Sequence, residues 1–262
     1  MAGLATGTAS AAPVCSDFHW IGAAGSGQRS GADMSAYAGM GKVVYESYQE
    51  LSSELAQSGK TITAEAVEYP ATEVPADGSI RGWLKFLGSV GDGTDAMADQ
   101  IKSYTERCPS TSVVLAGYSQ GAMVVHRNLY DLADNPHVAA ALLIADGDRL
   151  PVDTTVNMGS AALVSGVGKG VAQEHSTLAG TNTSPLPPAI GARTISVCDI
   201  GDPVCDYDPD KSTLSPAELA VHTAYTPTVT GLHAWGAPLY TTVMTQGHGP
   251  SARFETASGA GH

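Results

Sequence analysis

The stretch Thr111–Leu132, TSVVLAGYSQGAMVVHRNLYDL, constrains the fold of this chain more than any other. It opens with a short apolar run, Val113–Ala116, which is rich in β-branched residues and typical of a buried strand. A G-x-S-x-G pattern follows at Gly117–Gly121, and apolar residues at helical spacing come after it. A strand, a tight turn with a serine at its tip and a helix together indicate a nucleophile elbow. The alternative is a glycine-rich turn whose serine only caps the helix.

The elbow makes Ser119 the candidate nucleophile. Because the serine sits in a strained turn, the glycines two positions to either side let the strand and the helix pack closely. The helix N-terminus also directs backbone N–H groups at the point where negative charge develops during acyl transfer. The pattern therefore favours acyl-transfer chemistry at Ser119.

Length and charge narrow the class of protein. The chain has 262 residues, which fits one large α/β domain. Its 13 basic and 26 acidic residues give a net charge of −13, which disfavours nucleic acid and anionic membrane surfaces as partners. No run of 18 apolar residues predicts a membrane span. We expect a single domain over residues 1–262, with its core at about 14–246 and short disordered termini.

Four cysteines, Cys15, Cys108, Cys198 and Cys205, allow three disulfide pairings. The short loop between Cys198 and Cys205 favours a local bridge, and Cys15 with Cys108 would then tie the N-terminal segment to the core. None has the close spacing of zinc ligands. Because disulfides imply an oxidising compartment, we expect a secreted protein. Met1–Pro13 lacks the features of a signal peptide, and we interpret it as a leader left after signal removal, with Met1 added for expression.

Segments of strand and helix character alternate along the rest of the chain. Strands are expected at Asp17–Ile21, Thr61–Tyr69, Val138–Ala145 and Arg193–Val197. Helices are expected around the apolar stripe Val44–Leu55, which stops at Gly59, and at Asp95–Arg107, with Thr94 as its N-cap. This alternation predicts an α/β fold with a mostly parallel, doubly wound sheet.

Two segments are less regular. Pro70–Asp92 is rich in Gly and Pro, and we expect its apolar residues to form a short helix packed on the core rather than a pocket lining. These residues are Ile80, Trp83, Leu84 and Leu87. Asp146–Ala192 is a long irregular stretch of the kind that is usually functional or mobile in a compact domain. We interpret it as a lid or as a wall of the substrate cleft.

A nucleophilic serine needs a base, and the base needs an acid that orients it. The loop Cys198–Cys205, CDIGDPVC, follows a predicted strand and places carboxylates at the C-terminal edge of the sheet, where open α/β folds keep their sites. Ser215–Glu218 is a capping-box start of a helix, and His222 lies just beyond it. The order Ser, Asp, His along the chain is that of α/β-hydrolases.

Other residues compete for these roles. His233 is a rival base and Asp199 a rival acid, whereas His126, inside the elbow helix, is expected to be structural. The glycine-rich loop after the first strand lacks the lysine of a phosphate-binding loop, and Ser26 within it is the candidate second oxyanion donor. Asp206–Asp210 is either a calcium loop or, as we prefer, a solvated acidic turn.

Three motifs in order carry a family resemblance: GYSQGA around Ser119, the CDIGDPVC loop, and H-x-x-Y at His222–Tyr225. Together they resemble the cutinase family of serine esterases, which also includes acetylxylan esterases and actinobacterial lipase-like members. The resemblance covers roughly residues 14–246. It implies the α/β-hydrolase fold, a three-layer α/β/α sandwich around a central, mostly parallel sheet. It also implies the disulfide pairings Cys15–Cys108 and Cys198–Cys205.

Carried over by position, the resemblance makes Ser119 the nucleophile, Asp202 the acid and His222 the base. The backbone N–H of Gln120 and Ser26 would form the oxyanion hole. The implied activity is that of a secreted serine carboxylic-ester hydrolase that cleaves polyester or lipid esters through an acyl-enzyme on Ser119. No metal or organic cofactor is expected.

The expected partner is an ester substrate, namely a polyester, a lipid or an acetylated polysaccharide, and the chain is expected to act as a monomer. An acetylxylan esterase is the alternative within the same chemistry. A non-catalytic binding protein on the same fold is the second class of function. Such a protein would most simply lack one member of the triad, and all three residue types are present.

Overall fold

A single parallel sheet organises the computed structural model, which describes residues 15–75, 80–180, 183–211 and 213–247. The predicted leader and the end of the tail lie outside these residues. Among them, the sheet has the strand order β2-β1-β3-β4-β6-β5, and every neighbouring pair is parallel. The strands are β1 (Phe18–Ala23), β2 (Ile62–Ala66), β3 (Ser112–Tyr118), β4 (Val138–Ile144), β5 (Val156–Met158) and β6 (Thr194–Val197). The predicted α/β class is confirmed, with a sheet that is wholly parallel.

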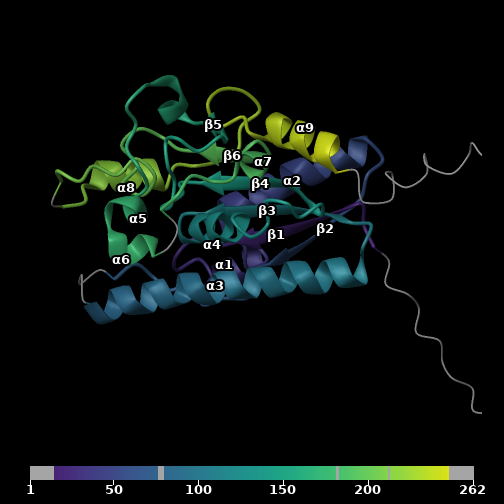
Figure 1. Ribbon diagram of the computed structural model, residues 1–262, viewed down its shortest axis with the longest axis horizontal. Helices are drawn as coiled ribbons and strands as arrows, with labels where there is room; N and C mark the ends of the chain where they lie inside the picture. Colours follow the sequence, from purple (N-terminus) through teal and green to yellow (C-terminus); the bar gives the residue numbers. More distant parts are fainter. Residues whose placement is uncertain (1–14, 76–79, 181–182, 212, 248–262) are drawn as a thin grey trace, which may run out of the picture.

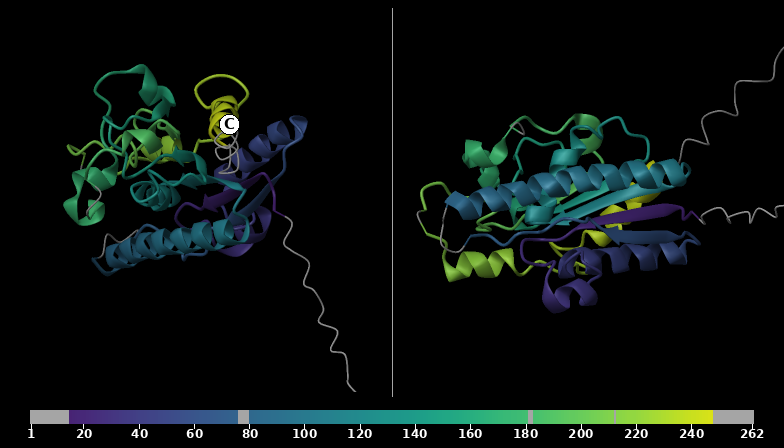
Figure 2. Two further views of the ribbon diagram at one scale, coloured as in Figure 1. Left: turned by 45° about the vertical axis from the view of Figure 1, so that its right-hand side comes forward. Right: turned by 90° about the horizontal axis from the view of Figure 1, so that it is seen from below.

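Helices cover both faces of this sheet and give the expected three layers (Figures 1 and 2). On one face lie α2 (Lys42–Gln57) and α9 (Gly236–Gln246), and on the other lie α3 (Ile80–Arg107) and α4 (Gln120–Leu129). The shorter helices are α1 (Gly31–Ala36), α5 (Val171–Glu174), α6 (Ser176–Ala179), α7 (Pro188–Gly191), α8 (Pro216–His222) and the 3-10 turn η1 (Ser160–Leu163).

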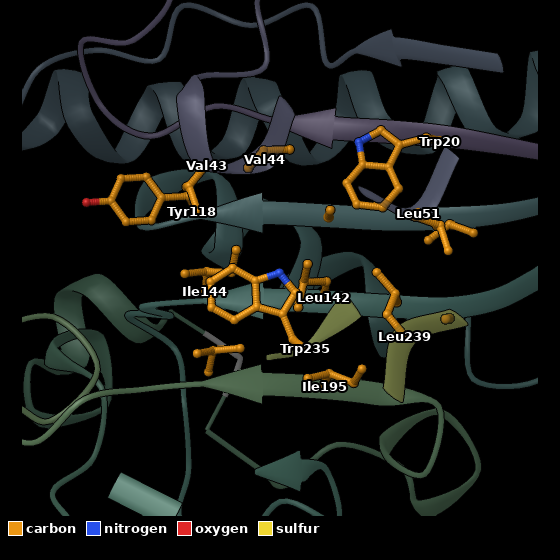
Figure 3. Close-up of a cluster of buried hydrophobic side chains, with 14 of the residues drawn as sticks. Trp20, Val43, Val44, Leu51, Tyr118, Leu142, Ile144, Ile195, Trp235 and Leu239 are labelled. Atoms are coloured by element: carbon orange, nitrogen blue, oxygen red, sulfur yellow. The ribbon is translucent and has the colours of Figure 1, made fainter. Parts of the chain in front are cut away.

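The hydrophobic core is divided into two clusters by the alternation of side chains along the central strands. On β3, Val114 and Tyr118 belong to the cluster beneath α2 and α9, whereas Leu115 belongs to the cluster beneath α3 and α4. Trp20 and Trp235 are fully buried in the first cluster (Figure 3). Because both faces are covered, the central strands are continuous apolar runs rather than alternating ones.

The helix α3 corrects the prediction for the segment after Pro70. We expected a short helix near Ile80 and a second helix from Asp95, but α3 runs unbroken over 28 residues. Thr94 is therefore not an N-cap, and its hydroxyl donates instead to the Val90 carbonyl at 2.9 Å within the helix. Trp83 packs against the core as expected, whereas Leu84 is 64% exposed.

Gly93 does not break α3, because its missing side chain has a packing role. A Cβ added at Gly93 would lie 2.7 Å from a Val124 methyl carbon of α4. The missing side chain thus lets the two helices approach closely. Phe86, Val90, Met97 and Ile101 form the buried face of α3, and this packing outweighs the low helix propensity of the glycines.

The irregular segment Asp146–Ala192 contains short elements that its sequence did not predict, including the edge strand β5. The side chain of Asp153 links two parts of this segment, because it accepts the backbone N–H of Leu150 at 3.0 Å and that of Leu186 at 2.9 Å. Whether the segment is a lid or a wall of a cleft stays a prediction.

Both disulfides implied by the resemblance are present. Cys15–Cys108 joins the segment before β1 to the residue after α3, across a sequence separation of 93. Cys198–Cys205 closes the loop after β6 across a separation of 7. In the described part of the chain, no helix combines the length and the apolar character needed to span a membrane.

A buried ionic cluster lies where α4 packs beside the end of β4. His126 is fully buried, and its Nδ1 lies 2.5 Å from Asp146 Oδ2, while Arg127 Nε donates to Asp148 at 2.7 Å. Burial alone would lower the pKa of His126, but the charge and hydrogen bond of Asp146, aided by Asp148 and Asp153, raise it to about 9. His126 therefore sits in the core with a partner of its own, as expected of a structural residue.

This cluster predicts a pH-dependent stability. The raised pKa means that the His126 contribution is fully present below about pH 6.5 and is lost as the pH rises through about 9. The loss should be on the order of 3 kcal/mol in the free energy of unfolding. Urea unfolding across this range measures it, and His126→Gln, which keeps an N–H donor near Asp146, should flatten the dependence. An equally steep decline in the variant would assign the effect to other groups.

Candidate active site

Ser119 occupies a strained turn between β3 and α4. Its φ of +54° and ψ of −118° lie in a region that residues with a side chain rarely adopt. A Cβ added at Gly117 would lie 2.1 Å from the Gly121 carbonyl oxygen, and one added at Gly121 would lie 2.1 Å from the carbonyl oxygen of Ala23. Only glycine fits at these two positions, which explains the G-x-S-x-G pattern in physical terms.

The structure brings Ser119, His222 and Asp202 together in one hydrogen-bonded chain. Ser119 Oγ lies 3.0 Å from His222 Nε2, and His222 Nδ1 lies 3.0 Å from each oxygen of Asp202. The residues come from the turn after β3, the end of α8 and the disulfide loop after β6. Because all strands are parallel, the turns after β3 and β6 lie at the same edge of the sheet.

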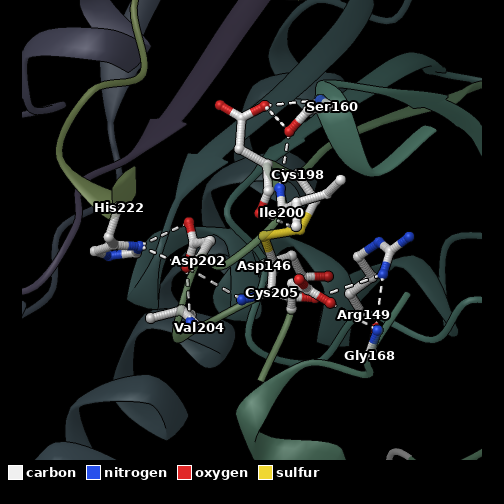
Figure 4. The surroundings of a disulfide bond; sticks show 12 residues. Asp146, Arg149, Ser160, Gly168, Cys198, Ile200, Asp202, Val204, Cys205 and His222 are labelled. Carbon is white, nitrogen blue, oxygen red and sulfur yellow. Dashed lines mark hydrogen bonds and ion pairs between the residues drawn. A yellow bond between two sulfur atoms is a disulfide. The ribbon is translucent and has the colours of Figure 1, made fainter. Parts of the chain in front are cut away.

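Asp202 is held in a fixed orientation by the loop that carries it. The residue has no exposed surface, and its Oδ1 accepts the backbone N–H groups of Val204 at 2.7 Å and Cys205 at 3.3 Å. Its Oδ2 accepts the Tyr225 hydroxyl at 2.8 Å. Figure 4 shows Asp202 facing His222 beside the Cys198–Cys205 disulfide. A buried carboxylate with this many donors stays in place and ready to orient a histidine.

His222 is positioned by α8 and by Tyr118. The predicted capping box starts α8: Ser215 Oγ accepts the Glu218 N–H at 3.2 Å, and Glu218 Oε2 accepts the Ser215 N–H at 2.9 Å. Tyr118 donates its hydroxyl to the His222 carbonyl at 2.6 Å, and its ring stacks on the imidazole with centroids 5.2 Å apart. The sequence assigned no role to Tyr118, since nothing local signals a contact across 104 residues.

The rival acid and the rival base pair with each other rather than with Ser119. His233 Nε2 lies 2.7 Å from Asp199 Oδ2, and Asp199 Oδ1 accepts the N–H of Ser160 at 2.8 Å and its hydroxyl at 3.0 Å. A cavity of about 550 Å³ opens beside this pair, and Ile200 and Leu232 also line it. Neither rival is hydrogen-bonded to the serine or to His222.

The two predicted oxyanion donors lie at the start of α4 and in the turn after β1. Gln120 begins α4, so its backbone N–H has no intrahelical acceptor. Ser26 lies in the turn after β1, is half-buried, and has no hydrogen-bond partner for its hydroxyl among the residues that the structure describes. The turn is pinned by the Gly27 N–H, which donates to Ala71 at 2.7 Å, and by Gln28, which accepts the Gly25 N–H at 3.0 Å. The oxyanion role of both residues stays a prediction.

The acidic segment from Asp206 differs in part from a solvated turn. Asp208 and Asp210 are exposed, as expected, but Asp206 accepts the backbone N–H groups of Gly168 at 2.7 Å and Gly201 at 2.8 Å. Its carboxylate thereby ties the disulfide loop to the irregular segment. No group of three or more His, Cys, Asp or Glu side chains within the described ranges is arranged to hold a metal ion.

Similar proteins are known for most of this chain. A family model described as Cutinase matches residues 14–235. The chain belongs to the cutinase family. Among curated members, cutinase cut1 of Trichoderma harzianum is 45% identical over 98 residues, which cover 36% of this chain and 35% of that protein.

Two further curated proteins are similar to this chain. The probable carboxylesterase Culp3 of Mycobacterium tuberculosis is 29% identical over 153 residues, 58% of this chain and 48% of that protein. Acetylxylan esterase 2 of Talaromyces purpureogenus is 31% identical over 152 residues, 55% of this chain and 61% of that protein. The chain thus spans about a third to a half of the length of the first two relatives.

Solved structures confirm the α/β-hydrolase fold of the cutinase family. An acetylxylan esterase matches with a TM-score of 0.57 at 21% identity, covering 89% of this chain and 100% of that one. A cutinase-like protein from Cryptococcus sp. matches with a TM-score of 0.58 at 17% identity, covering 88% and 95%. At these identities the likeness concerns the fold alone.

Two glycine variants, one at the elbow and one as its control, test the packing around Ser119. Gly121→Ala should displace Ser119 and abolish labelling by a serine-reactive fluorophosphonate, because the new methyl group overlaps the Ala23 carbonyl. Gly91→Ala, at an exposed position of α3 where an added Cβ meets nothing within 4 Å, should label normally and be more stable by about 0.5–1 kcal/mol. Labelling of Gly121→Ala at the wild-type rate would show that the close contact does not govern the serine.

Proposed function

We propose that this protein is a serine carboxylic-ester hydrolase with Ser119 as its nucleophile. One observation carries the proposal: the unbroken chain of hydrogen bonds from Ser119 Oγ through both nitrogens of His222 to Asp202, with each distance at 3.0 Å. This is the arrangement in which a base deprotonates a serine while an acid fixes the tautomer of the base. A binding protein would have no need for it.

The reaction proceeds in two acyl transfers. His222 Nε2 takes the Ser119 proton as Oγ attacks the ester carbonyl, and then returns that proton to the oxygen of the departing alcohol. Water next attacks the acyl-enzyme, giving its proton to His222, which passes it back to Ser119 as the carboxylic acid leaves. Asp202 stays ionised throughout and stabilises the imidazolium that forms in each step.

The negative charge of each tetrahedral intermediate is stabilised by the Gln120 N–H and by Ser26. The free N–H at the start of α4 supports this assignment, as does the Ser26 hydroxyl, which has no partner among the described residues. The contact of Gly121 with Ala23 brings the start of α4 and the end of β1 together.

Removal of one oxyanion donor tests that assignment. Ser26→Ala should lower kcat by about 10²- to 10³-fold, which corresponds to about 2.7–4 kcal/mol of transition-state stabilisation. The melting temperature should change little, because the hydroxyl has no partner among the described residues. Steady-state kinetics on a soluble ester measures the effect, and Ser26→Thr serves as a control that keeps a hydroxyl. A wild-type kcat in Ser26→Ala would remove Ser26 from the mechanism.

We infer that the substrates are polyester or lipid esters. The cutinases among the similar proteins support this class. Apolar side chains around the His222 helix also support it: Ile200, Leu219 and Leu232 are 43–48% exposed. Acetylated polysaccharide is the second candidate, because an acetylxylan esterase is comparably similar to this chain.

Hydrolysis of p-nitrophenyl esters from acetate to palmitate distinguishes these substrates. We expect activity that peaks at butyrate or longer and that disappears in Ser119→Ala, which should fold like the wild type. A sharp preference for acetate would favour acetylated polysaccharide instead. Full activity in Ser119→Ala would show that the elbow assignment, and the mechanism built on it, is wrong.

We further propose a secreted, monomeric protein with one domain. The two disulfides support an oxidising environment. Both core clusters share a single sheet, which supports one folding unit. All groups of the proposed triad come from one chain, so hydrolysis needs no second subunit.

A further inference from the structure

Tyr225 lies between the two carboxylates of the disulfide loop. It follows His222 by three residues and is 6% exposed. Its hydroxyl lies 2.8 Å from Asp202 Oδ2 and, on its other side, 2.8 Å from the backbone nitrogen of Asp199. The same oxygen therefore touches the proposed catalytic acid and the rival acid that does not take that role.

The direction of these two hydrogen bonds follows from their chemistry. A backbone N–H can only donate, so the Tyr225 oxygen accepts from Asp199, and its own proton goes to Asp202. Burial, followed by the negative charge of Asp202, raises the pKa of Tyr225 far above its ordinary value. The phenol consequently remains a donor at every pH at which such a protein works.

Asp199 is itself fixed, so its N–H gives the Tyr225 hydroxyl a constant direction. The Asp199 side chain is bonded to Ser160 and His233, and the ring of His233 stacks on that of Tyr225 with centroids 5.4 Å apart. The pair Asp199–His233 thus forms an outer layer behind Tyr225. The ring of Tyr118 packs against the ring of Tyr225 at 6.2 Å.

We propose that Tyr225 is a positioning residue of the triad, which holds Oδ2 of Asp202 against His222. This inference rests on the proposed function. Backbone N–H groups bind only Oδ1 of Asp202. If the Tyr225 hydroxyl is removed, Oδ2 has His222 as its one remaining partner among the described residues. The carboxylate plane is then free to turn, and the imidazole loses a rigid acceptor.

Tyr225→Phe tests the role, because it removes one oxygen and keeps the ring packing. We expect kcat for a p-nitrophenyl ester to fall about tenfold, the size typical of one lost hydrogen bond to a charged group, with KM unchanged. The acid limb of the kcat/KM profile should also move to higher pH, because the lost hydroxyl dipole had its positive end near the imidazole and disfavoured its protonated form. If Tyr225 had only a structural role, the variant would show neither the shift of the acid limb nor a fall in kcat at unchanged KM.

The ionisable groups around the imidazole make this shift interpretable. Asp202 faces His222 from the disulfide loop, and the phenol of Tyr118 faces it from β3. Asp199 and His233 stand behind Tyr225, and the bond between their side chains does not involve the phenol oxygen that the variant removes. Tyr225→Phe therefore removes a single dipole and no charge from these surroundings.

Tyr240→Phe is the matched control. Tyr240 lies on α9, and its hydroxyl bonds Ser58 at 2.6 Å, away from the triad. This variant should keep the wild-type kcat and pH profile. If Tyr225→Phe proves too unstable to assay, a fluorinated tyrosine incorporated at position 225 replaces it; as a stronger donor, it should move the acid limb to lower pH. An unmoved limb would overturn the proposal.

The assay separates this inference from the proposed function. Ser119→Ala is measured in parallel: if the wild type shows no Ser119-dependent hydrolysis, the proposed function fails and the role of Tyr225 fails with it. If the wild type hydrolyses the ester and Tyr225→Phe matches it in both kcat and pH profile, only the positioning role is refuted. A tenfold lower kcat with a shifted acid limb supports the role.

Discussion

The close approach of three backbone segments at Gly117, Gly121 and Ala23 is the contact on which the rest of the site depends. It places the end of β1 against the start of α4 with no room for a methyl group between them. The strained conformation of Ser119 persists because the buried strand before it and the buried helix after it determine the path of the turn. Ser119 and the start of α4 thus derive their position relative to the end of β1 from one packing contact.

The other half of the site is built differently, from loops that hydrogen bonds make rigid. Asp202 and His222 lie outside the sheet, and each depends on partners from distant parts of the chain. Tyr118 links the two halves, since it precedes Ser119 and donates to the backbone carbonyl of His222. Core packing therefore positions Ser119, whereas a polar network positions His222 and Asp202.

Much of the fold and of the candidate site could be predicted from the sequence, and the features that were missed have physical reasons. The strands around β3 and the candidate nucleophile Ser119 were recognisable because a buried apolar run and a fixed local pattern are sequence-local signals. The choice of Asp202 and His222 came from the family resemblance. The length of α3 was not recognisable, because the Gly and Pro content of Pro70–Asp92 indicated a loop, and only the neighbouring α4 shows why a side chain is missing at Gly93. The three residues of β5 are too few to show a period. The bonds of Tyr118 and Tyr225 join segments that only the fold brings together.

The two disulfides differ in what they constrain. In a chain-entropy description, the bridge across 93 residues restricts the unfolded chain by about 4.7 kcal/mol, and the bridge across 7 residues by only about 2.5 kcal/mol. The long bridge accordingly acts on the folding equilibrium of the whole domain. The short one acts mainly on the shape of the loop that carries Asp202. The two bridges thus constrain two separable properties of one molecule: the free energy of the folded domain, and the position of Asp202 within it.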